Sequence, residues 1–127
     1  MPTLLRIAAI YSLACAIGLA GSNLWPAVGP APGPEARSLA LALAIANLAY
    51  ALLLWPAARR PAEHRAVLYV ALTVFGLRAV LGTWEVLYTL EGAPAVVRLF
   101  DMVASLALFV GILNGLPSVL AAPTIKR

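Results

Sequence analysis

The segment HRAVLYVALTVFGLRAVLGTWEVLYTL, residues 64–90, is apolar along most of its length. A helix needs about 20 mostly apolar residues to cross the hydrocarbon core of a bilayer. Arg78 and Glu85 nevertheless lie inside this stretch. A charge at the centre of a membrane helix costs about 2.5–3.5 kcal/mol, so both side chains need protein or water around them. The stretch therefore predicts a membrane helix that packs against other helices.

Three further stretches have the same apolar character. The chain has 127 residues, of which 63% are hydrophobic and 11% are charged, and its mean hydropathy is +0.94. A soluble domain of this length cannot bury so much apolar surface. We predict a single all-α domain, an integral membrane bundle of four transmembrane helices at about residues 5–25, 36–55, 64–90 and 96–116. A barrel would require strands with alternating polar residues, and that alternation is absent.

Segments rich in proline, glycine and arginine separate the predicted helices: WPAVGPAPGPEARS (25–38), WPAARRPAEHR (55–65) and EGAPA (91–95). Loops on the cytoplasmic side carry an excess of Lys and Arg. The basic residues that follow this rule are Arg6, Arg59, Arg60, Arg65, Lys126 and Arg127, whereas Glu35, Arg37 and Glu91 lie on the other side. We therefore predict that both termini are cytoplasmic. Topology explains the net charge of +4, and no nucleic-acid partner is expected.

The composition also indicates where the protein resides. Its richness in Ala, Leu, Arg and Pro is typical of a high-GC bacterium. We therefore expect a multi-pass protein of a bacterial inner membrane, with the lipid bilayer as its main partner.

Several kinds of chemistry are excluded by the residues present. A lone Cys15 cannot form an internal disulfide or a C-x-x-C redox pair. His64 is the only histidine, so two histidines cannot hold a haem between helices. The spacing of Cys15, Glu63 and His64 does not match a metal site. The sequence contains no nucleophile elbow and no phosphate-binding loop. We expect no cofactor, and a protein that is non-enzymatic or weakly enzymatic.

The polar residues inside the predicted helices point to one pocket. Arg78 and Glu85 are seven residues apart and share a helix face. At about 1.5 Å per residue, Glu85 lies roughly 7–8 Å below the end of its helix, and Asp101 lies equally deep in the next helix. Arg98 is one turn from Asp101 and can pair with it. Asn47 falls at the depth of Arg78, so the pocket should be deepest at Arg78 and Asn47.

The five residues predicted to bind a ligand are Arg78, Glu85, Asp101, Asn47 and Arg98. Side chains lean towards the N-terminus of their helix, so Arg78 should lean away from Glu85. We therefore expect a water molecule or Asn47 to complete the contact between the two charges. The same network could instead serve only to lock the helices together.

A small-residue pattern occurs in the last predicted helix. GILNG, residues 111–115, places Gly111 and Gly115 four positions apart. Such small-xxx-small patterns let helix backbones approach closely. The pattern predicts close packing inside the bundle or, as the alternative, a homodimer through Gly111 and Gly115.

In length and layout the chain resembles the DoxX-like group of small four-helix membrane proteins. The resemblance spans nearly the whole chain and is carried by LLRIAAIYSLACAIGLAG (4–21), RRPAEHR (59–65) and GLRAVLGTWEVLYTLEGAP (76–94). It implies a four-helix membrane protein, and an association with quinone-linked oxidation in some members. The resemblance provides no catalytic motif to transfer to this chain.

Three functions are compatible with these residues. In the leading one, the pocket binds a small amphiphilic or anionic molecule, with Arg78 supplying positive charge and Glu85 and Asp101 setting its protonation and orientation. In the second, the chain is an accessory subunit of a larger respiratory or photosynthetic membrane complex. In the third, it is a proton-coupled transporter with Glu85 as the proton carrier.

The predicted orientation can be tested with a fusion at the C-terminus. A reporter that is active only in the periplasm should give no signal when it is fused after Arg127, because the basic residues hold that end in the cytoplasm. A strong periplasmic signal would reverse the orientation.

Overall fold

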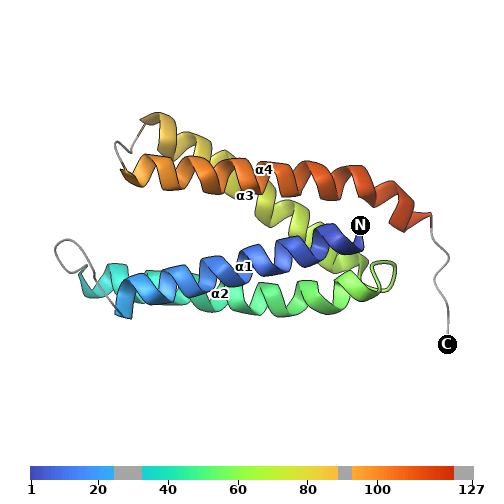
Figure 1. Cartoon of the computed structure of the whole chain (residues 1–127), viewed down its shortest axis with the longest axis horizontal. Helices are drawn as coiled ribbons and strands as arrows, with labels where there is room; N and C mark the ends of the chain where they lie inside the picture. The colour runs from blue at the N-terminus through green and yellow to red at the C-terminus, as the bar shows by residue number, and fades with distance from the viewer. Residues whose placement is uncertain (25–32, 89–92, 122–127) are drawn as a thin grey trace.

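The computed structural model describes residues 1–24, 33–88 and 93–121, and it contains four helices in these ranges. They are α1 (Pro2–Leu24), α2 (Pro34–Arg59), α3 (Arg65–Tyr88) and α4 (Ala93–Leu120), drawn in Figure 1. All four are long and apolar enough to cross a membrane. The prediction of an all-α chain with four such helices is therefore confirmed. Most of the first loop, Glu91, Lys126 and Arg127 lie outside the described residues.

Prolines stand at the first position of two helices. Two other prolines, which we expected to end a helix, lie inside one. Pro2 and Pro34 begin α1 and α2, because a proline at the first helical position gives up only a donor that would be unpaired anyway. Pro56 and Pro117, in contrast, lie inside α2 and α4. Both helices therefore continue past the predicted ends at about residues 55 and 116, to Arg59 and Leu120.

Packing explains why these two helices continue past their prolines. A proline removes one hydrogen bond within the helix, and Pro56 and Pro117 each lie within the last turn or so. The residues that follow are held by their neighbours, since Ala57 and Ala58 are fully buried and Val119 belongs to the core. Burial of these side chains outweighs the lost bond.

The helices form two antiparallel hairpins. In the first hairpin α1 packs along α2, and in the second α3 packs along α4, whereas contacts between the hairpins are sparse. The first residues of α1 and the last residues of α4 lie at the same end of the molecule. At this end Arg65, the first residue of α3, donates from Nη2 to the carbonyl oxygen of Leu120 at 3.4 Å. We call this the terminal end, and the end where α1 and α3 finish the distal end. Figure 1 shows the hairpins converging at the terminal end and separating distally.

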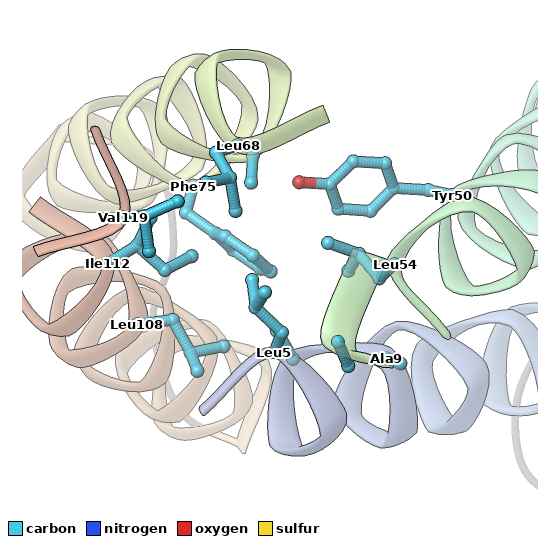
Figure 2. Close-up of a cluster of buried hydrophobic side chains, with 12 residues drawn as sticks. Leu5, Ala9, Tyr50, Leu54, Leu68, Phe75, Leu108, Ile112 and Val119 are labelled. Carbon is cyan, nitrogen blue, oxygen red and sulfur yellow. The ribbon is translucent and has the colours of Figure 1, made fainter. Parts of the chain in front are cut away.

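An apolar core joins the two hairpins at the terminal end. Phe75 of α3 is fully buried in its middle, and Figure 2 shows it surrounded by side chains from all four helices. The ring of Tyr50 from α2 meets Phe75 edge-on, with 5.8 Å between centroids. Lipid tails are as apolar as these side chains, so close packing rather than transfer from water holds membrane helices together.

Three glycines mark the closest approaches between helices. A Cβ atom at Gly111 or Gly115 of α4 would lie 2.8 or 2.7 Å from side-chain atoms of Leu4 or Met1 in α1. The small-residue pattern therefore serves packing inside the chain, which was one of the two predicted uses, and the homodimer stays a prediction. Gly82 of α3 faces Met102 of α4, whose Cβ would lie 3.0 Å from an added Cβ.

Replacement of Gly82 tests the packing inside the second hairpin. Gly82→Val should lower the free energy of unfolding by about 1–3 kcal/mol, because the added branches meet an atom fixed close to the α4 backbone. Gly18→Val is the matched control, since an added Cβ there meets nothing within 4 Å. Thermal unfolding in detergent measures both variants. Equal stability of the two would contradict the close approach of α3 and α4.

Candidate functional site

A cavity of about 560 Å³ lies between the hairpins, on the distal side of the core. Residues of α2 and α3 form most of its wall. Its lining consists of Leu19, Leu43, Ala46, Asn47, Tyr50, Val74, Arg78, Leu81, Gly82, Glu85, Arg98 and Asp101. The structure thus brings all five residues predicted from the sequence to one cavity. Their role in binding a ligand stays a prediction.

Arg78 is the centre of the polar contacts in this cavity. Its Nη2 atom donates to Asp101 Oδ1 at 2.6 Å and to Cys15 Sγ at 3.4 Å, and its Nη1 atom donates to Asn47 Oδ1 at 3.0 Å. The guanidinium group also lies over the ring of Tyr11, 5.5 Å from the centroid, at a distance typical of cation–π contacts. Arg78 belongs to α3, and these partners come from α1, α2 and α4. One side chain therefore ties all four helices together.

Asp101 is the counter-charge of Arg78 and the most enclosed acidic group of the site. Its side chain is 13% exposed, against 22% for Arg78. It also accepts a hydrogen bond from the hydroxyl of Tyr11 and pairs with Arg98 Nη1 at 3.3 Å. Hydrogen bonds between charged partners are about twice as strong as neutral ones. The contact predicted between Arg98 and Asp101 is present.

Glu85 and Arg98 form a second ion pair across α3 and α4. This pair lies farther towards the distal end and is more open, with Arg98 42% and Glu85 34% exposed. Because Arg98 also contacts Asp101, the four charges form one alternating series, Arg78–Asp101–Arg98–Glu85. The series is electrically neutral.

Asn47, one of the two links predicted between Arg78 and Glu85, does not join them in the structure. Among the described residues, Arg78 pairs with Asp101 and not with Glu85, and the link to Glu85 runs through Asp101 and Arg98 rather than through Asn47. Asn47 instead accepts from Arg78 and donates to the carbonyl oxygen of Leu43 at 2.8 Å. Arg78 therefore turns to the nearest carboxylate, because attraction between opposite charges in a low-dielectric interior outweighs the general lean of helical side chains.

Three site residues were absent from the predicted set. Tyr11 and Cys15 contact the polar series from α1, and their spacing of four residues places them on one helix face. Tyr50 lies in the cavity wall, and in the described part of the chain its buried hydroxyl has no hydrogen-bond partner. Its position three residues after Asn47 was the only signal in the sequence. The position of a residue along its helix can be read from the sequence. Which neighbouring helix that residue faces cannot be read from it.

The chemistry available at this site is hydrogen bonding and charge pairing. Within the described ranges, no three His, Cys, Asp or Glu side chains are grouped so that they could hold a metal ion. The lining combines the charged series with aliphatic residues such as Leu19, Leu43 and Leu81. A molecule with one polar end and an apolar body matches this division.

Comparison of the chain with protein-family models, with curated proteins and with solved structures finds no match. The resemblance to the DoxX-like group therefore stays a prediction.

A double-mutant cycle measures the central ion pair. Arg78→Leu or Asp101→Leu alone should cost about 3 kcal/mol of stability, because each leaves its partner's charge unmatched in a buried site. The double variant should cost clearly less than the sum of the two. Thermal or denaturant unfolding in detergent provides the free energies.

Two control cycles sharpen this test. Arg60 and Glu63 form an exposed pair at 3.4 Å, so their coupling should stay below about 1 kcal/mol. The pair Arg78 and Glu85, which is joined only through other residues, should couple less than Arg78 and Asp101. Additive effects for Arg78 and Asp101 would mean that their contact contributes nothing to stability.

Proposed function

We propose that this chain is a multi-pass protein of a bacterial inner membrane and that its cavity binds a small amphiphilic molecule. Four apolar helices support membrane insertion. The basic residues Arg59, Arg60 and Arg65 lie at the terminal end, beside the junction of Arg65 with Leu120. A basic end of this kind supports placing both termini in the cytoplasm. The DoxX-like resemblance belongs to the same proposal.

The main support for the proposed binding function is the cavity. Its volume of about 560 Å³ falls within the range of about 300–1,000 Å³ that is usual for small-molecule sites. Such sites have mostly apolar walls and a few polar groups in fixed positions. Here the polar groups are the side chains around Arg78 and Asp101, which hold one another in place. A bound molecule would meet a preformed polar floor.

A purely structural network explains the charges less completely. Locking four helices together requires the contacts of Arg78 and Asp101, but it does not require open space beside them. Packed protein interiors leave few voids larger than a water molecule. The cavity next to the ion pairs therefore favours binding over a structural role alone.

Fewer observations support the other two predicted functions. For the accessory subunit, Trp84 and Tyr88 form a ring pair with centroids 4.6 Å apart, and both are exposed on α3. Such an exposed aromatic pair suits contact with another protein as well as with lipid. For the transporter, Glu85 would have to leave its ion pair with Arg98 in order to carry a proton. Amphiphile binding needs neither a partner chain nor a broken ion pair.

Filling the cavity tests the proposed function. Ala46→Trp places an indole in the cavity wall and should displace a bound molecule, whereas Ala49→Trp places the same group on α2 outside the cavity lining. The protein is extracted from membranes in mild detergent, and its bound lipid-soluble molecules are measured by mass spectrometry. We expect one species to be retained in near-stoichiometric amount by the natural protein and by Ala49→Trp, and lost from Ala46→Trp. Equal retention by both variants would contradict binding in this cavity.

A further inference from the structure

We infer that the molecule bound in this cavity carries an uncharged head group with hydrogen-bonding capacity, and that it enters from the bilayer between α2 and α3. This inference rests on the proposed binding function and specifies its ligand. Three features of the cavity support it: the balance of its charges, the polar groups that are left over, and the side on which it opens.

The charges that face the cavity cancel one another. Arg78 and Arg98 are matched by Asp101 and Glu85, and each member has an ion-pair partner. An anionic head group would have to compete with Asp101, which lies 2.6 Å from Arg78, and would leave that carboxylate without its partner. A cationic head group would compete with Arg78 or Arg98 in the same way. A buried ion that loses its partner is strongly unfavourable, so the cavity disfavours charged head groups of either sign.

The polar capacity that remains is uncharged. The amide of Asn47 has two N–H donors, and one of them is used by the carbonyl oxygen of Leu43. This amide lies beside Arg78, to which its oxygen is bonded. A hydroxyl, carbonyl or ether oxygen is the kind of head group that the remaining N–H of this neutral amide recognises.

The cavity opens towards the lipid-facing side of α2 and α3. Leu43 of α2 and Leu81 of α3 line it and are 46% and 59% exposed. Both lie inside helices that are candidate membrane spans, and contacts between α2 and α3 are sparse. An apolar tail can therefore lie between the two leucines and continue into the hydrocarbon. The opening predicted from the sequence ran only past Glu85 and Asp101 towards the distal end.

Two photoactivatable probes with the same tail test this inference. A diazirine-bearing 1-dodecanol is uncharged, and the matching dodecane sulfonate is an anion at neutral pH. The full-length protein is reconstituted in phosphatidylcholine vesicles, and labelling at Leu43 and Leu81 is measured by mass spectrometry relative to Leu52, an exposed residue of α2 that does not line the cavity. Ala46→Trp reports how much of the labelling depends on the cavity.

We expect the alcohol to label Leu43 and Leu81 in preference to the sulfonate, and Ala46→Trp to abolish the labelling by both. Asp101→Asn should move the preference towards the sulfonate by about tenfold, because Arg78 then lacks its counter-charge. Glu85→Gln removes a more exposed charge and should shift the preference in the same direction by a smaller factor. This variant provides the test if Asp101→Asn does not fold. Asp101→Glu keeps the charge and should keep the preference for the alcohol.

Each contrary outcome has a separate meaning. Cavity-dependent labelling by the sulfonate that equals or exceeds labelling by the alcohol would overturn the uncharged head group and leave amphiphile binding in place. A preference that stays unchanged in both charge-removing variants would overturn the argument from charge balance. Absence of cavity-dependent labelling by either probe would overturn the proposed function itself.

Discussion

A guanidinium group enclosed by four apolar helices requires a negative charge beside it, and the arrangement of the polar side chains in this structure follows from where that charge lies. Arg78 is matched by Asp101 at 2.6 Å, and the two belong to neighbouring helices of the second hairpin. From this pair, further contacts reach Tyr11, Cys15 and Asn47 in the first hairpin. Outside the apolar core, these contacts of the ion pair join the two hairpins.

The polar floor and the apolar core support each other. The ring of Phe75 lies 6.4 Å from that of Tyr11 and 5.8 Å from that of Tyr50. Tyr11 therefore touches the core with its ring and the polar side chains with its hydroxyl, whereas the hydroxyl of Tyr50 is buried without a hydrogen-bond partner among the described residues. The four helices close tightly below this layer, towards the terminal end, and leave the cavity above it. A bundle that is packed at one end and open at the other can hold a ligand without losing its fold.

Much of the fold could be predicted from the sequence, because length and hydropathy determine membrane helices. The four helices followed from composition, and the grouping of the five polar residues at one cavity followed from their positions along the helices at a rise of about 1.5 Å per residue. The ends of α2 and α4 could not be predicted, since Pro56 and Pro117 signal a stop and only burial of the next residues shows that the helix continues.

The pairing of charges was beyond the sequence for a similar reason. Because Glu85 lies on the same helix face as Arg78, the sequence predicted Glu85 as its interaction partner. The partner in the structure is Asp101, which belongs to a different helix. The rotation of each helix about its axis depends on packing, which a single sequence does not reveal. The same limit concealed Tyr50, whose place in the cavity wall depends on how α2 faces α3.

The distance between the hairpins at the distal end shows whether the contacts of Arg78 and Asp101 hold the two hairpins together. Spin labels at Leu41→Cys and Val96→Cys, in a Cys15→Ser background, place one probe near the distal end of each hairpin, and pulsed electron resonance measures their separation in vesicles. The account predicts a narrow distance distribution in the parent, and a longer and broader one when Asp101→Leu or Arg78→Leu removes the ion pair. An unchanged distribution in both variants would contradict the claim that this pair holds the two hairpins together.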